Sequence, residues 1–97
     1  MSIYQLDIDE EIKRDIERLP GHIRQRVKRI IAGLLDNPRP SSAQELSHRA
    51  GIPSGIYRIW VDSWRVVYRP DDDLLLIKVL KVGKKHGPEF YLPLVES

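Results

Sequence analysis

The sequence predicts an α+β fold in the order β-α-α-β-β-β, with a two-helix hairpin packed on a small antiparallel sheet. Apolar residues recur at helical spacing between residues 9 and 36. Apolar and polar residues alternate before this region and again from residue 56 onward, as in strands. Helices and hairpin strands thus occupy separate stretches, which is typical of α+β proteins. With 97 residues, we expect one domain over residues 1–97.

The N-terminal part predicts a strand followed by a helix. Residues 3–8 alternate between apolar and polar, as a half-buried strand does. Asp9 can then cap a helix, and Glu10 and Glu11 suit the positive end of the helix dipole. One narrow apolar stripe follows, formed by Ile12, Ile16 and Leu19. Pro20 and Gly21 end this helix.

A second helix is predicted from about Gly21 to Asp36. Its apolar residues follow helical spacing: Ile23, Val27, Ile30, Ile31, Leu34 and Leu35. Asn37 and Pro38 end it. Residues 37–55 are rich in Pro, Ser and Gly and predict a long loop, with a short helical turn from Ala43 to Leu46.

Three strands are predicted in the C-terminal half: Ile56–Val61, Trp64–Arg69 and Leu74–Val82. The two residues 62–63 join the first pair, and residues 70–73 join the second. The third strand begins almost entirely apolar, as expected of a strand covered on both sides. The remaining tail predicts a loop and a short extended stretch.

Composition excludes several classes of protein. The chain has no cysteine, which rules out disulfides and thiolate metal sites. No signal peptide is recognisable, and no apolar run approaches the ~20 residues that cross a bilayer. We therefore expect a soluble cytoplasmic protein that does not contact membranes. Metal-ligand spacings, phosphate-binding glycine loops and nucleophile elbows are missing, so we expect neither a metal nor a cofactor.

The net charge of +2 conceals an uneven distribution. Residues 1–20 hold six acids, whereas residues 20–35, 48–70 and 74–91 each hold four Lys or Arg against at most one acid. Positive charge gathered on particular elements attracts polyanions. The alternative is that each group is an ordinary solvated surface.

The predicted hairpin gathers its arginines on one face. A two-residue turn gives the pairs Val61–Trp64, Trp60–Arg65, Ile59–Val66, Arg58–Val67 and Ile56–Arg69. Directly opposed residues share a face, and the faces alternate along a strand. One face, expected to pack under the helices, carries Tyr57, Ile59, Val61, Trp64, Val66 and Tyr68. The other carries Arg58, Trp60, Arg65, Val67 and Arg69.

Three guanidinium groups and an indole on rigid strands fit single-stranded nucleic acid. Guanidinium groups bind phosphate oxygens, and the aromatic ring offers a surface for a stacked base. Trp60 opposite Arg65 also permits a cation–π contact. The alternative is a solvent-facing sheet with ordinary positive charges.

Further candidate residues follow the last strand. The cations Lys84 and Lys85, together with His86, could close one wall of a phosphate site. Neighbouring cations would lower the pKa of His86 and favour its neutral form. Tyr91 lies beside apolar residues and is alternatively part of the core.

Nearly the whole chain resembles the RelE/ParE superfamily of bacterial toxins from type II toxin–antitoxin systems. The matching segments are YQLDID, LPGHIRQRVKRIIAGLLDNP, GIYRIWVDSWRVVYRP and IKVLKVGKKHGPEFY. The hairpin followed by a hydrophobic strand and V-G-K-K is the most specific part. The resemblance implies a RelE-like microbial RNase fold. For the RelE branch it implies a ribosome-dependent endoribonuclease that cleaves mRNA in the A site and so inhibits translation.

The chemistry implied for this branch is attack of a ribose 2′-OH on the adjacent phosphate, which leaves a 2′,3′-cyclic phosphate and a 5′-OH. Cations stabilise the charge on the phosphorane, and placement of the RNA supplies much of the remaining rate. The implied catalytic residues are Arg58, Arg65, Lys85 and Tyr91. Among them Arg65 holds the scissile phosphate, Lys85 protonates the leaving oxygen and Tyr91 orients the nucleotide.

Other RNA contacts are expected from Trp60, Arg69, Lys81, Lys84 and His86. Some members of the branch have a lysine, proposed as the general base, where this chain has Trp60. An indole cannot take that proton, so Lys81, Lys84 or His86 would substitute, or positioning by the ribosome would do more of the work.

Two further functions stay open. The ParE branch poisons DNA gyrase without cutting RNA, and the lysine missing at Trp60 favours this branch. Alternatively, the chain is an inactive module whose cations only hold an acidic antitoxin. Under each reading the partner is a cognate antitoxin, which would shield the cations and carry the complex to operator DNA.

Overall fold

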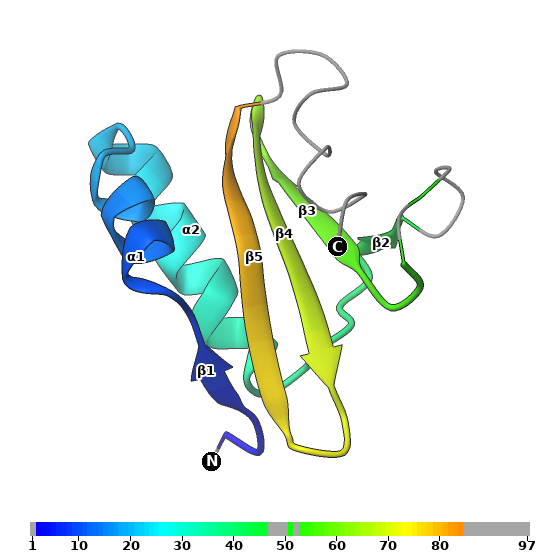
Figure 1. Cartoon of the computed structure of the whole chain (residues 1–97). Coiled ribbons are helices and arrows are strands. Elements are labelled where there is room, and N and C mark those ends of the chain that lie inside the picture. The colour runs from blue at the N-terminus through cyan, green and yellow to red at the C-terminus, as the bar shows by residue number, and fades with distance from the viewer. Residues whose placement is uncertain (1, 47–50, 52, 85–97) are drawn as a thin grey trace.

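The computed structural model describes residues 2–46, 51 and 53–84. Its elements are β1 (Gln5–Asp7), α1 (Glu10–Glu17), α2 (Gly21–Leu34), β2 (Gln44–Glu45), β3 (Tyr57–Val61), β4 (Trp64–Asp71) and β5 (Leu76–Lys84). The strands form one sheet in the order β1-β5-β4-β3-β2, and both helices pack against the same face of it (Figure 1). This arrangement confirms the predicted α+β class and the pair of helices. Neither of the described helices is long and apolar enough to cross a membrane.

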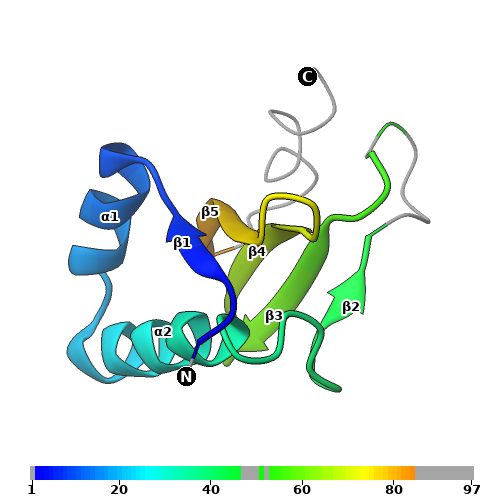
Figure 2. The same cartoon turned by 90° about the horizontal axis from the view of Figure 1, so that it is seen from below.

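The sheet is mixed, whereas the sequence predicted an antiparallel one. β1 runs parallel to β5 at one edge, because the helix pair carries the chain across the sheet before β3 begins (Figure 2). The predicted helical turn from Ala43 to Leu46 is also wrong, since residues 44–45 form β2 antiparallel to β3. The extended backbone lets Leu46 reach a buried cluster with Ile56 and Val67, which explains why a strand forms there.

The helices form near the predicted residues and bury one side each. Asp9 occupies the N-cap position of α1, but its side chain makes no capping hydrogen bond. α2 ends at Leu34, two residues before the predicted end. The residues that the helices bury are Ile16, Ile23, Val27, Ile31 and Leu34. Most of them pack on valines from β3, β4 and β5, and this contact forms the main core.

The hairpin has the predicted register. The pairs Val61–Trp64, Trp60–Arg65, Ile59–Val66 and Arg58–Val67 all occur. The ladder begins at Tyr57 opposite Tyr68, so the predicted pair Ile56–Arg69 lies just beyond it. On the helix side, Ile59, Val61, Val66 and Tyr68 are buried as expected, and Tyr57 and Trp64 are half-buried.

β5 begins at Leu76, two residues later than predicted, because Leu74 and Leu75 belong to the turn between β4 and β5. β4 and β5 also extend two residues beyond their predicted ends, to Asp71 and Lys84. Leu75 has a positive φ of 55°, and both side chains are exposed. The Asp71 Oδ1 atom accepts hydrogen bonds from the backbone N–H groups of Asp73 (3.1 Å) and Leu74 (2.9 Å). These bonds close the turn and delay the start of β5 to Leu76.

A β-bulge interrupts β5. Val67 pairs with Lys81 while its neighbour Tyr68 pairs with Val79, which leaves Leu80 as an extra residue. In a regular strand, positions 79 and 82 would face opposite sides. The bulge brings both valines into the core and moves Lys81 to the face opposite the helices.

Candidate nucleic-acid interface

The candidate site lies on the face of the sheet opposite the helices, here called the cationic face. Strand register places six of its residues in two neighbouring rows. One row runs Lys81, Val67, Arg58 and Gln44, and the other runs Arg65 and Trp60. The central residue Val67 is fully buried, so the cations surround an apolar floor. Each residue stands on a hydrogen-bonded strand, which fixes its backbone.

Trp60 contacts both arginines of the hairpin. The ζ carbon of Arg65 lies 3.6 Å from the centroid of the indole ring, and that of Arg58 lies 5.0 Å from it. Trp60 itself is 47% exposed. The cation–π contacts therefore hold two guanidinium groups beside an aromatic ring that solvent can reach.

The two arginines are less exposed than a solvent-facing patch would be. Arg58 is 7% and Arg65 is 9% exposed. The Arg58 Nη2 donates to Gln44 Oε1 at 2.5 Å, and the Arg65 Nη1 donates to the backbone oxygen of Ser63 at 3.2 Å. These acceptors are neutral, and a guanidinium has five donors in a fixed fork. These hydrogen bonds orient the two arginine side chains, which are also largely buried.

The remaining predicted residues divide into three groups. Arg69 is exposed on the cationic face, where it pairs in register with Lys78, and Lys81 lies half-buried on that face. Lys84 instead pairs with Trp64, its Nζ 5.7 Å from the ring centroid, so the structure does not bring it to Arg58 and Arg65. Outside the described residues lie Lys85, His86 and Tyr91.

A second polar cluster lies at the other end of the sheet and escaped the sequence analysis. Arg39 donates to both carboxylate oxygens of Asp72, at 3.2 and 2.9 Å, and to the hydroxyl of Tyr57 at 3.2 Å. The hydroxyl of Tyr4 donates to Asp72 at 2.8 Å. No local sequence signal marks this cluster, because Asp72 lies 33 residues from Arg39 and 68 from Tyr4.

The contacts within this cluster favour the charged form of Asp72. The hydrogen bonds from Arg39, and then that from Tyr4, lower the pKa of the Asp72 carboxyl. The same carboxylate raises the pKa of the Tyr4 hydroxyl. Nearby, burial raises the pKa of Tyr68, whose hydroxyl donates to the backbone oxygen of Pro38 at 2.7 Å. The cluster thus ties the loop after α2 to the β4–β5 turn.

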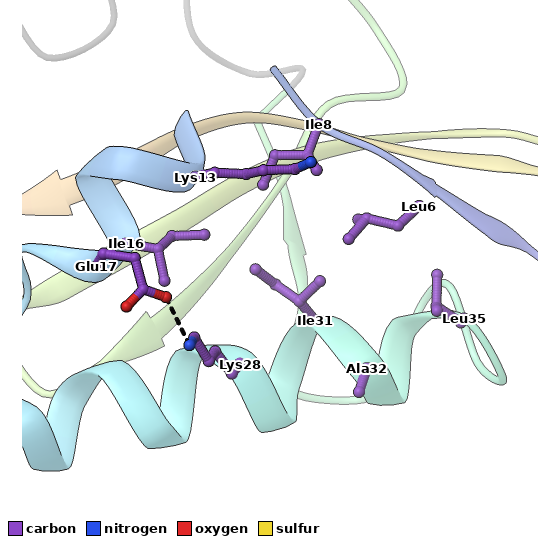
Figure 3. A pocket seen from close by; sticks show the side chains of 9 residues that line it. All are labelled: Leu6, Ile8, Lys13, Ile16, Glu17, Lys28, Ile31, Ala32 and Leu35. Atoms are coloured by element: carbon purple, nitrogen blue, oxygen red, sulfur yellow. Dashed lines mark ion pairs between the residues drawn. The ribbon is translucent and has the colours of Figure 1, made fainter. Parts of the chain in front are cut away.

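An apolar groove of about 460 Å³ opens between α1, α2 and β1. Figure 3 shows its lining residues: Leu6, Ile8, Lys13, Ile16, Glu17, Lys28, Ile31, Ala32 and Leu35. The Nζ of Lys28 and a carboxylate oxygen of Glu17 form an ion pair of 2.6 Å beside it. The groove therefore suits apolar side chains better than it suits a phosphate. Within the described part of the chain, no three His, Asp or Glu side chains gather to hold a metal ion.

Comparison with known proteins identifies relatives over nearly the whole chain. The family described as ParE toxin of type II toxin–antitoxin system, parDE, matches residues 6–87. The chain is 30% identical over 90 residues to the mRNA interferase toxin RelE of Escherichia coli K12, covering 91% of this chain and 90% of that protein. The same match is found with the mRNA interferase RelE of Shigella flexneri.

Solved structures agree with this result. An arginine-to-alanine double mutant of E. coli RelE in the free state has a TM-score of 0.74 and 28% identity, covering 99% of this chain and 97% of that one. The intact E. coli RelBE toxin–antitoxin complex matches with a TM-score of 0.68 and 28% identity, over 86% of this chain and 98% of that one. The resemblance seen in the sequence is thereby confirmed, and the chain belongs to the RelE/ParE superfamily of toxins from type II toxin–antitoxin systems.

Proposed function

We propose that this chain is a ribosome-dependent endoribonuclease that cleaves mRNA in the A site and inhibits translation in the cytoplasm. The observation that carries the proposal is the pair of oriented guanidinium groups held against the exposed ring of Trp60. Its relatives named mRNA interferase support the choice of substrate. A phosphate and a base are the two features of RNA that guanidinium groups and an indole recognise.

In the proposed reaction, the ribose 2′-OH attacks the adjacent phosphate while the bond to the 5′ oxygen breaks. Arg65 contacts a non-bridging oxygen of the scissile phosphate, and Arg58 stabilises the charge that builds on the phosphorane. Oriented donors of this kind contribute on the order of 10²-fold to 10³-fold in rate each. Trp60 offers a ring on which a neighbouring base stacks.

Two protons must move in this reaction. Trp60 cannot accept one, so we assign the base that removes the 2′-OH proton to Lys81, which shares the cationic face with Arg58. His86 is the other candidate base. Lys85 protonates the leaving 5′ oxygen, and Tyr91 orients the nucleotide.

The test maps new 5′-OH ends in cellular mRNA after the protein is induced. We expect ends within A-site codons for the unmodified chain and for Arg39→Ala, and none for Arg65→Ala. Arg39→Ala is the matched control, because it removes an arginine that lies outside the cationic face. Unchanged mRNA in cells whose growth is arrested would exclude the ribonuclease.

A second function, inhibition of DNA gyrase without RNA cleavage, is favoured by two observations. The matching family is described by the name ParE. The resemblance to the superfamily also implies, for some members that cut RNA, a lysine base at the position of Trp60, and an indole cannot serve as that base. Supercoiling by purified gyrase in the presence of the protein distinguishes the two functions. Loss of supercoiling together with intact mRNA would replace the ribonuclease proposal by this one.

We further propose a cognate antitoxin as the partner, as the RelBE toxin–antitoxin complex of a relative suggests. An amphipathic antitoxin segment would place apolar side chains in the groove between α1 and α2, and acidic residues near Lys13 at its rim. Residues 59–61 of β3 extend beyond β2 and pair with no other strand among the described residues on that side, so we propose this edge as a second docking surface. We expect contact with operator DNA only through the antitoxin.

Neutralisation of toxicity tests the docking groove. The product of the adjacent upstream gene, coexpressed with this chain, should restore growth. Ala32→Arg fills the groove with a charge and should abolish the rescue. Gln25→Arg, an equal change at an exposed position of α2 that does not line the groove, should leave the rescue intact. Equal rescue of both variants would place the antitoxin elsewhere.

A further inference from the structure

We propose that Gln44 is a positioning residue that holds Arg58 in the orientation required to stabilise the reacting phosphate. The inference rests on the proposed ribonuclease function and adds to it a residue that the sequence did not single out. Gln44 acts through Arg58, to which it is joined by a hydrogen bond of 2.5 Å.

The geometry of the sheet makes the contact direct. Gln44 of β2 and Arg58 of β3 are Cα partners in an antiparallel pair, so their side chains leave the sheet on the same face. An arginine side chain has several rotatable bonds and loses entropy when it is fixed. The hydrogen bond to Gln44 and the contact with Trp60 select one orientation before RNA arrives.

β2 is only two residues long, yet Glu45 and the adjacent Leu46 hold it in place. The Oε2 atom of Glu45 accepts a hydrogen bond from the backbone N–H of Gly55 at 3.1 Å. The backbone N–H of Leu46 donates to the oxygen of Ile56 at 2.9 Å, and the Leu46 side chain is 3% exposed. These contacts anchor the backbone beside Gln44, so its amide has a defined place from which to hold Arg58.

The chemistry of an amide suits this position. A carboxylate here would form an ion pair with Arg58 and would repel a phosphate. The carbonyl oxygen of Gln44 accepts one hydrogen bond without adding a negative charge.

The experiment measures single-turnover cleavage of mRNA in programmed ribosomes over a range of toxin concentrations. Gln44→Met keeps the length of the side chain but removes the acceptor. We expect the maximal rate to fall by about 10- to 100-fold while the half-saturating concentration stays nearly constant. Gln44→Glu should lower the maximal rate further. Gln25→Met, at an exposed position of α2, is the control and should match the unmodified chain.

A double-mutant cycle shows whether Gln44 acts through Arg58. In an Arg58→Ala background, Gln44→Met should have no additional effect, because the side chain that it positions is gone. A purely structural role would give additive losses and a lowered melting temperature. Additive losses, or an unchanged rate for Gln44→Met alone, would overturn the inference while leaving the ribonuclease proposal intact. Full activity of both Arg58→Ala and Arg65→Ala would instead overturn the proposed site itself.

Discussion

The protein holds its arginines in two different ways. Arg39 lies in the loop after α2 and binds the carboxylate of Asp72 through two hydrogen bonds. Arg58 and Arg65 stand on strands, are nearly buried, and contact an amide, a backbone carbonyl and an indole. Exposure alone would select Arg39 and not the two arginines of the proposed RNA site, because Arg39 is the most accessible of the three.

The difference lies in the chemistry of the partners. The carboxylate of Asp72 neutralises Arg39, and its hydrogen bonds with Arg39 and Tyr4 lower its pKa below the ordinary value. The ion pair between Arg39 and Asp72 joins the loop after α2 to the β4–β5 turn. An indole ring and an amide oxygen orient a guanidinium without adding a negative charge. At these contacts Arg58 and Arg65 meet neutral groups, whereas Arg39 meets a carboxylate.

After the complete loss expected for Arg65→Ala, the next largest effect comes from replacing Arg65 by lysine. Arg65→Lys keeps the positive charge but loses the planar fork and much of its stacking on Trp60. We expect mRNA cleavage to slow by about 100-fold. The paired variant Arg39→Lys should cleave at nearly the normal rate in the same assay. A similar loss of cleavage rate in Arg65→Lys and Arg39→Lys would show that the surroundings of these two arginines do not give them different functions.

A smaller loss is expected when the ring itself is removed. Trp60→Ala deletes the stacking surface and the contact with both arginines. Loss of a base–aromatic stack of about 1–3 kcal/mol corresponds to a weakening of RNA binding by roughly 5- to 150-fold. The RNA affinity of Trp60→Phe should lie between that of Trp60→Ala and that of the unmodified chain. The half-saturating concentration in single-turnover cleavage reports this effect, and an unchanged value for Trp60→Ala would contradict it.

Asp72→Asn should affect stability and not cleavage. The pKa of Asp72 is lowered in the folded protein from its ordinary value of 3.8, so the stabilisation is complete above that pH. It is lost as the pH falls through the lower, folded-state value. We expect a melting temperature a few degrees lower, up to about 4 °C, for Asp72→Asn at neutral pH.

Melting temperatures measured at acidic pH provide a control for Asp72→Asn. The difference in melting temperature between Asp72→Asn and the unmodified chain should shrink once the pH drops below the ordinary value of 3.8. Thermal unfolding followed by circular dichroism over a series of pH values measures this. A difference that stayed constant with pH would show that the charge of Asp72 is not the source of the stability.

The smallest effect is expected at the hairpin turn. Arg26 of α2 pairs with Asp62 at 3.1 Å, and both side chains are about half exposed. Exposed ion pairs of this kind contribute little. Arg26→Ala should therefore shift the melting temperature by less than about 3 °C and leave cleavage unchanged. A large loss of activity would mean that α2 itself contacts the substrate complex.

Local patterns were sufficient to predict much of the fold. A two-residue turn and strict alternation fixed the register of β3 and β4, and with it the face shared by Arg58, Trp60 and Arg65. The contacts that decide how those side chains are used come from distant segments. Gln44 reaches Arg58 from a strand that composition assigned to a loop, and Asp72 reaches Arg39 across the molecule. Tertiary packing, which a local pattern does not encode, brings these pairs together.

The bulge at Leu80 has a consequence for reading related sequences. It acts as a phase shift, after which odd and even positions of β5 exchange sides. If the strand ran through Leu80 without a bulge, Val82 would turn outward and Lys81 would turn toward the helices, although no letter of the sequence had changed. The face of the sheet on which a lysine of β5 lies therefore depends on its position relative to the bulge. In a sequence alignment, a gap placed one residue away would assign that lysine to the opposite face.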